Sequence, residues 1–176
     1  NVTGILDSYS SLYRIQLTQG ATYTDANPRT LAPDVEPGEL TISSFNVLNY
    51  FLDIDDGVND ICGPDGIQEC RGADTALELE RQRAKILAAL EGIEADIFGL
   101  MEIQNDTGAS TADLVAGLND IFGVDTYDYI DTGFIGGDAI KQAIIYKPAA
   151  VTPVGDYEIL DSTVDPRFID DLNRPV

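Results

Sequence analysis

Alternating apolar and polar side chains mark the start of the main ordered region of this chain. Residues 40–48, LTISSFNVL, alternate with the two-residue period of a β-strand. Residues 75–94 repeat apolar side chains at helical spacing, Thr75 and Glu78 form a capping box, and Gly92 predicts the end of this helix. The next stretch, ADIFGLMEI, is apolar at nearly every position, as a covered strand should be. The pattern therefore predicts a strand, a helix and a second strand in succession.

Further helical and strand patterns follow. A second helix is predicted over residues 110–122, and strands are predicted near 127–131 and 139–147. The glycine-rich stretch 132–138 joins these two strands as a hairpin turn. Helices and strands in this order predict an α/β (α+β) fold.

The N-terminal part of the chain has a different pattern. Residues 3–17 predict two short strands around a polar turn, which are too few to form a sheet of their own. The stretch after them has no hydrophobic period and is rich in proline, as linkers are. We therefore interpret residues 1–30 as the C-terminal β-hairpin of an upstream domain, residues 31–39 as a linker and residues 40–176 as a second domain.

Charge restricts the classes of function. The chain carries 31 acidic and 10 basic residues, which gives a net charge of −21. Such a surface repels nucleic acid at long range and argues against non-specific coating of DNA. It does not exclude a nuclease, because divalent cations neutralise carboxylates and bridge them to phosphate. No apolar run approaches the roughly 18 residues that a membrane span requires, so no membrane partner is predicted.

The two cysteines indicate the compartment. Cys62 and Cys70 flank a loop, CGPDGIQEC, whose glycines and proline favour tight turns. We predict a disulfide between them, which places the protein outside the reducing cytoplasm. Two separate buried thiols are the alternative, whereas zinc is disfavoured because the chain contains no histidine and no further thiol.

Two oxygen-bearing side chains are expected at the ends of the first two strands of the main region. A strand, a helix and a strand nearly always bring both strands parallel into one sheet, so Asn46 and Glu102 should lie near the same edge. A carboxylate and an amide oxygen are hard ligands suited to Mg²⁺ or Ca²⁺. The alternative is that Glu102 pairs with an arginine and Asn46 caps a turn. Spacing alone leaves both interpretations open.

A set of motifs between residues 40 and 176 resembles a known family. The motifs are SFNVLNYF, CRGAD, ERQRAKILAAL, GLMEIQND, GGDAIKQAIIYKPAAVTPVG and NRPV. In this order they look like the endonuclease/exonuclease/phosphatase superfamily, and most of all like its secreted bacterial extracellular deoxyribonucleases. The resemblance implies a four-layer α/β/β/α sandwich with a metal-assisted phosphodiesterase site at one edge.

The resemblance also suggests roles for individual residues. Asn46 matches the family position whose amide helps to hold the metal and the scissile phosphate, and Glu102 matches the metal-binding glutamate. The implied cofactor is Mg²⁺ or Mn²⁺, with Ca²⁺ as a further candidate. Lys141 and Arg174 are expected to contact substrate phosphate. Their alternatives are a solvated strand face and a loop salt bridge, respectively.

The chain departs from the family in one respect. Family members activate water with a histidine base, and a second histidine supports the transferring phosphoryl group, but this chain has no histidine. We therefore expect residues 40–176 to be the N-terminal half of the catalytic domain and to be inactive alone. The expected partners are DNA, bound by the complete domain, and the C-terminal half. The uncovered apolar face of a single sheet should otherwise drive self-association.

Other functions keep the same scaffold. A phosphomonoester, a phosphoinositide or a sphingomyelin headgroup is an alternative substrate, because fold does not select among them. A non-catalytic extracellular adhesion or matrix module is an alternative of a different class. No dedicated protein partner is evident from the sequence.

Two weaker patterns concern charged side chains. The loop DIDDGVND resembles a calcium site but lacks the spacing and closing glutamate of an EF-hand, so a solvated acidic loop is favoured. Its candidate ligands are Asp53, Asp55, Asn59 and Asp60. Four basic residues collect near the first helix, where surface ion pairing with Glu78 and Glu80 is favoured over a DNA track. They are Arg71, Arg81, Arg83 and Lys85.

Overall fold

The structure, a computed structural model, describes residues 1–26, 30, 36 and 38–166. These residues belong to two compact units, Asn1–Glu36 and Pro37–Val176. None of the helices in the described ranges is long and apolar enough to cross a membrane.

The first unit contains a β-hairpin. Strand β1 (Gly4–Tyr9) pairs antiparallel with β2 (Leu12–Leu17), and the turn residues Ser10 and Ser11 have positive φ angles of 52° and 67°. Turns of this kind match the twist of a two-stranded hairpin. The large apolar side chains of both strands are exposed, and an isolated hairpin is marginally stable in water. The prediction of two short strands around a polar turn is confirmed, whereas the expectation that they are too few to form a sheet of their own is wrong, because β1 and β2 pair as a two-stranded sheet.

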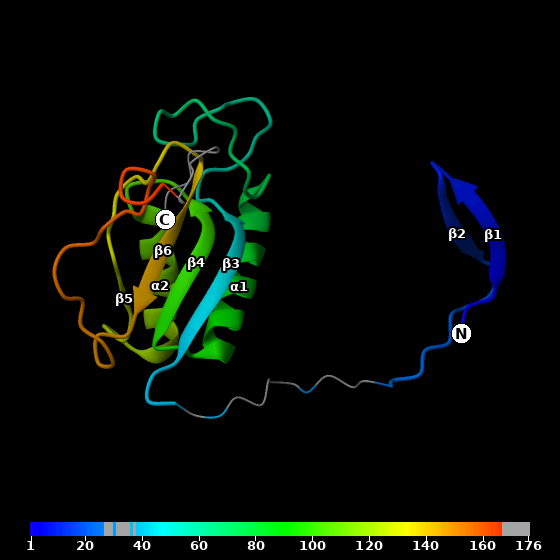
Figure 1. Ribbon diagram of the computed structural model, residues 1–176, viewed down its shortest axis with the longest axis horizontal. Helices are drawn as coiled ribbons and strands as arrows, with labels where there is room; N and C mark the ends of the chain where they lie inside the picture. Colours follow the sequence, from blue (N-terminus) through cyan, green and yellow to red (C-terminus); the bar gives the residue numbers. More distant parts are fainter. Residues whose placement is uncertain (27–29, 31–35, 37, 167–176) are drawn as a thin grey trace. The chain divides into compact units, whose positions relative to one another are not determined.

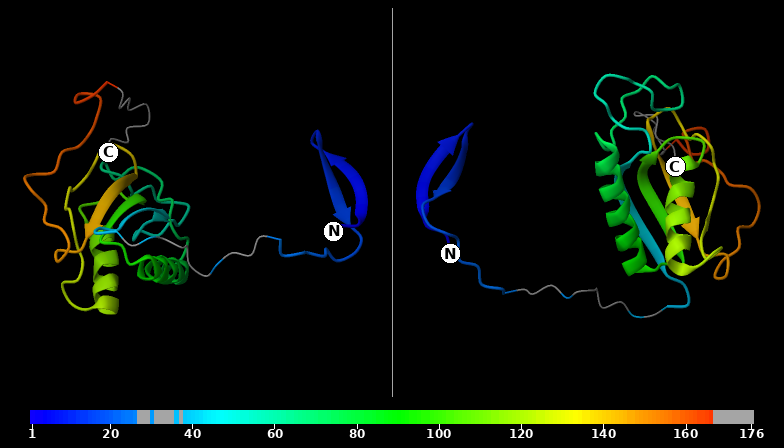
Figure 2. Two further views of the ribbon diagram at one scale, coloured as in Figure 1. Left: turned by 60° about the horizontal axis from the view of Figure 1, so that its bottom comes forward. Right: turned by 180° about the vertical axis from the view of Figure 1, so that it is seen from behind.

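The second unit consists of a four-stranded sheet and two helices. Its elements are β3 (Ile42–Tyr50), α1 (Ala76–Ile93), β4 (Ile97–Gln104), α2 (Ala109–Phe122), β5 (Asp128–Tyr129) and β6 (Ile140–Tyr146). The strand order is β3-β4-β6-β5, with β3 parallel to β4 and the other pairs antiparallel. Both helices cover the same face of the sheet, as views from the front and from behind show (Figures 1 and 2). The predicted α+β class is confirmed.

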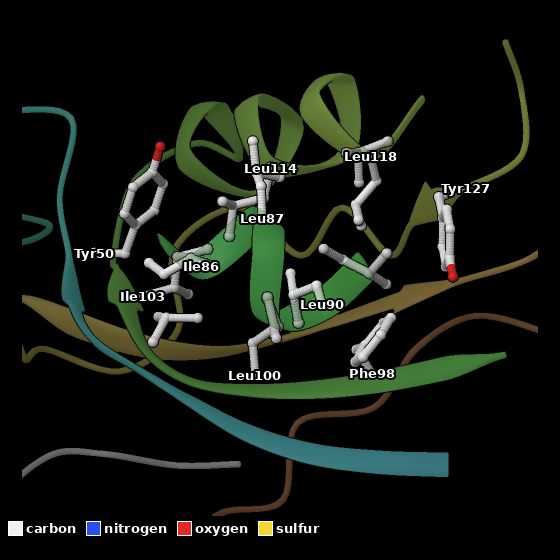
Figure 3. Packing of buried hydrophobic residues seen from close by; sticks show 14 of the residues in the cluster. Tyr50, Ile86, Leu87, Leu90, Phe98, Leu100, Ile103, Leu114, Leu118 and Tyr127 are labelled. Carbon is white, nitrogen blue, oxygen red and sulfur yellow. The ribbon is translucent and has the colours of Figure 1, made fainter. Parts of the chain in front are cut away.

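The hydrophobic core lies between the sheet and the two helices (Figure 3). Its fully buried large side chains include Tyr50, Leu90, Phe98, Leu114 and Tyr127. The helices approach closely because α2 carries glycine at position 117. A Cβ atom on Gly117 would lie 2.6 Å from Cδ1 of Leu87 on α1, so a larger residue there would require the Leu87 side chain to shift.

Helix α1 begins as predicted and ends differently. The Thr75 hydroxyl accepts a hydrogen bond from the Glu78 amide at 3.2 Å, which confirms the capping box. The helix continues past Gly92, and Glu94 adopts the left-handed conformation at its C-cap, with φ of 51°. The Glu94 carbonyl accepts a hydrogen bond from Nζ of Lys147 at 3.0 Å, so a tertiary contact helps to satisfy this helix end.

Cys62 and Cys70 form the predicted disulfide. Both are buried, and they pack with Phe51, Ala139 and Ile140 in a small apolar cluster separate from the main core. The disulfide ties the long loop after β3 into a compact unit. It is compatible with a protein of an oxidising, extracellular environment.

The core assignment predicts a clear contrast along α1. Leu90→Ala should lower the free energy of unfolding by about 2–5 kcal/mol, because Leu90 is fully buried and its truncation leaves a cavity. Leu77→Ala is the matched control, since Leu77 is 57% exposed and its truncation should cost less than about 0.5 kcal/mol. Urea unfolding followed by circular dichroism measures both, and equal losses would contradict the assigned buried face.

Candidate functional site

The parallel pairing of β3 with β4 is interrupted by a bulge. Residues pair one to one up to Asn46 with Met101, and the next pair is Tyr50 with Ile103. Three residues of β3 therefore lie opposite Glu102 alone, which interrupts the ladder as a β-bulge does. Asn46 and Glu102 were predicted at strand ends; instead, both strands continue beyond the bulge.

The bulge places Asn46 and Glu102 on neighbouring strands, since Asn46 pairs with Met101, the residue before Glu102. Its backbone is unusual, because Leu48, Asn49 and Glu102 have φ angles of 56°, 51° and 61°. The left-handed region costs a residue other than glycine roughly 1–2 kcal/mol. Such strain is common at functional sites, so the bulge is a candidate functional site.

Asn46 both caps a turn and presents an oxygen to solvent. Its Oδ1 accepts a hydrogen bond from the Leu48 amide at 2.7 Å, which is the turn contact that the alternative interpretation predicted. The side chain is nevertheless exposed, and a carbonyl oxygen has a second lone pair. The Leu48 contact therefore orients the carboxamide without consuming its capacity to bind a cation.

The Glu102 carboxylate has no hydrogen-bond or ion-pair partner within the described ranges. Its side chain is half-buried, and among the described residues its carboxylate takes part in no hydrogen bond and no salt bridge. None of the arginines in the described ranges therefore pairs with Glu102. A half-buried carboxylate without a described protein partner keeps its oxygens open to water or to a cation.

Asn46 and Glu102 suit part of the ligand shell of a divalent cation. Mg²⁺ in proteins is commonly held by one or two carboxylates, with waters and substrate phosphates completing six oxygen ligands. One carboxylate and one oriented amide oxygen on adjacent strands are the kinds of ligand in that donor set. The described residues contain no group of three or more aspartate, glutamate, cysteine or histidine side chains that could hold a metal, so these two residues alone would bind it weakly.

The structure corrects the expectation for Lys141. Its side chain is only 3% exposed, and Nζ donates hydrogen bonds to the carbonyls of Asp106 at 2.8 Å and Gly133 at 2.7 Å. Burial lowers the pKa of Lys141, while the nearby carboxylates of Asp106 and Asp131 oppose that shift. Lys141 therefore fastens two loops together, and neither phosphate contact nor a solvated strand face describes it.

Two buried side-chain amides, Gln104 and Asn105, follow Glu102 in the sequence. No role was predicted for them from the sequence. Oε1 of Gln104 accepts from the Leu52 amide at 2.8 Å, and its Nε2 donates to Oδ2 of Asp53 at 2.6 Å. Nδ2 of Asn105 donates to the Ile135 carbonyl at 2.7 Å. These bonds anchor the flanking loops to the end of β4. The only sequence signal was a pair of amides directly after an apolar strand.

The acidic loop after β3 does not form the calcium site considered above. Asp53 binds Gln104, Oδ1 of Asp55 accepts from the Gly57 amide at 3.1 Å, and Nδ2 of Asn59 donates to Asp56 at 2.6 Å. These short-range contacts direct the side chains to different partners. Asp53, Asp55, Asn59 and Asp60 are therefore not gathered around one point, and no three carboxylates of the described residues are.

The comparisons with known proteins leave the family open. No protein-family model matches the chain, and no curated protein matches it. Arg174, the second predicted phosphate contact, lies outside the described residues. The functional interpretation therefore depends on the motifs and on the geometry around Asn46 and Glu102.

The strained backbone at Glu102 predicts an unusual response to glycine. Glu102→Gly should raise the free energy of unfolding by about 0.5–1 kcal/mol, because glycine adopts the left-handed region without penalty, less its own entropy cost. Glu80→Gly in the middle of α1 is the control and should lower it by about 1 kcal/mol. Thermal unfolding compares the two. A lower free energy of unfolding in both variants would contradict the inferred backbone strain at Glu102.

Proposed function

We propose that this chain supplies the metal-binding edge of a secreted, divalent-metal-dependent nuclease that hydrolyses phosphodiester bonds of extracellular DNA. The observation that carries the proposal is the half-buried carboxylate of Glu102, which no described residue pairs, on the strand next to the oriented carboxamide of Asn46. The motif resemblance supports a bacterial extracellular deoxyribonuclease. The disulfide supports secretion.

Each residue has a definite role in this proposal. The Glu102 carboxylate holds Mg²⁺ or Mn²⁺, or Ca²⁺, and Asn46 adds an oxygen ligand while its amide hydrogens are available to a phosphate oxygen. When bound, the cation supplies positive charge that stabilises the phosphoryl group during hydrolysis. It also offsets the repulsion between DNA and a protein of net charge −21.

The proposal assigns activation of water to residues outside this sequence. The family resemblance calls for a histidine base, and the 176 residues contain none. Asn46 and Glu102 would therefore bind the metal and the substrate phosphate in this chain without completing the reaction. Metal binding and hydrolysis are thus separate properties and need separate measurements.

Metal binding tests the site directly. Glu102→Gln should weaken Mn²⁺ binding at least about tenfold, because it replaces with a neutral amide the carboxylate at the bulge that no described residue pairs. Glu91→Gln, at an exposed position of α1, removes the same charge and should leave the affinity within about twofold. Isothermal titration calorimetry and Mn²⁺ electron paramagnetic resonance measure both variants. Unchanged Mn²⁺ affinity in Glu102→Gln, with circular dichroism showing an intact fold, would overturn the site.

Hydrolysis tests the missing base. The purified chain should not nick supercoiled plasmid DNA with Mg²⁺, Mn²⁺ or Ca²⁺, because it has no histidine to activate water. Metal-dependent nicking that disappears in Glu102→Gln would show that the chain carries its own base. It would thereby refute this part of the proposal while supporting the metal site.

A further inference from the structure

A hollow of about 530 Å³ adjoins the bulge on the side of helix α1. One wall is formed by Leu48 and Asn49, the residues that follow the Asn46 turn. The helix is held against this wall, since Nε2 of Gln82 donates to the Leu48 carbonyl at 2.7 Å. We call this hollow the α1 pocket. Its charged lining residues are Arg71, Asp74, Glu78, Arg81 and Lys85.

The α1 pocket contains two cations that the fold does not use. Every other lysine and arginine in the described ranges forms a salt bridge. Arg81 and Lys85 form neither a salt bridge nor a hydrogen bond with any described residue. Ion pairing with Glu78 or Glu80, which the helical spacing favoured, is therefore wrong for these two. Both unpaired cations line the same pocket.

The acidic residues of the pocket do not neutralise these cations directly. Oε2 of Glu78 accepts hydrogen bonds from the Asp74 amide at 3.1 Å and the Thr75 hydroxyl at 3.4 Å, so it serves the helix cap. Lys85 lies about two helical turns beyond Glu78, away from that cap. Asp74 is the remaining carboxylate, and the described residues provide it with no salt-bridge partner.

We propose that the α1 pocket binds a phosphate group of a nucleic-acid strand, with Arg81 and Lys85 as its charge partners. Arg71 lines the same pocket while pairing with Asp138 at 2.9 Å, so it offers a third, already positioned guanidinium. Arginine and lysine are the usual protein partners of phosphate. In a chain of net charge −21, two unpaired cations in one hollow are placed where an anion would be stabilised.

The size and position of the pocket favour a nucleotide over a free anion. A volume of about 530 Å³ is typical of pockets that hold whole small ligands, whereas inorganic phosphate would fill little of it. The pocket begins two residues after Asn46, so a strand whose phosphate reaches Asn46 would extend into it. The choice of a nucleic acid rests on the proposed function, whereas the choice of an anion does not.

Binding to a short fluorescein-labelled single-stranded oligodeoxynucleotide, measured by anisotropy, tests this inference. EDTA removes metal-mediated binding, and about 0.1 M salt reduces the Debye length to about 10 Å, so the distant acidic surface is screened. The double variant Arg81→Gln/Lys85→Gln should lose at least about tenfold in affinity. Its slope of log affinity against log salt should become shallower by about 1.4, since each single-strand phosphate contact contributes about 0.7.

Control variants outside the pocket separate the effect of the pocket from that of net charge. Arg14→Gln in the N-terminal hairpin removes one cation and should leave binding within about twofold of the unmodified chain. Asp74→Asn should strengthen binding, whereas Glu91→Gln, which changes the net charge equally at the far end of α1, should not. Inorganic phosphate should compete only weakly with the oligonucleotide.

The possible outcomes decide between the two proposals. No oligonucleotide binding by the unmodified chain, or equal binding by the double variant, would overturn the pocket. Competition by inorganic phosphate as effective as that by unlabelled oligonucleotide would overturn its assignment to nucleic acid. Loss of binding in the double variant together with unchanged Mn²⁺ affinity in Glu102→Gln would reject the metal site and keep the pocket.

Discussion

The parallel pairing of β3 with β4 is the constraint on which the rest of the second unit depends. Parallel neighbours require a crossover, and α1 supplies it while burying Ile86, Leu87 and Leu90 against the sheet. The crossover returns the chain to the start of β4, so α1 begins at the edge where β3 ends (Figure 1). The bulge and the α1 pocket therefore share one edge as a consequence of topology.

The strained bulge persists because its surroundings hold it from several directions. Gln82 binds the Leu48 carbonyl from α1, and beyond the bulge the Tyr50 hydroxyl donates to Asp113 of α2 at 2.5 Å. Asp113 also accepts from Nε of Arg83 at 2.7 Å, so one carboxylate links β3 with both helices. Burial and the Asp113 carboxylate raise the pKa of Tyr50 above its usual range, which keeps this phenol a donor. These contacts offset the cost of the strained backbone conformation, which the residues of the bulge would not adopt by themselves.

The predictions that succeeded depend on local signals, and those that failed depend on tertiary contacts. The capping box of Thr75 and Glu78 and the disulfide of a glycine-rich loop involve residues close in sequence. The bulge was not predicted, because the positive φ angles of Leu48 and Asn49 are held by a partner distant in sequence, Gln82 of α1. The environment of Lys141 is set by carbonyls of distant loops, so its strand position alone suggested exposure. The parallel pairing of the two strands that carry Asn46 and Glu102 was therefore predictable, whereas the strain of the bulge, the buried amides and the neighbouring pocket were not.

Net charge and local charge have different consequences in this protein. The acidic excess acts over the whole surface and is weakened by salt, whereas groups within a few ångströms interact inside the screening length. A basic side chain that is paired, as Arg83 is with Asp113, stabilises the fold and is not available to bind an anion. Arg81 and Lys85 remain available because no carboxylate in the described part of the chain pairs with them. A strongly acidic surface can thus coexist with an anion-binding pocket, and high ionic strength would favour this combination by suppressing the long-range repulsion more than the contacts within the pocket.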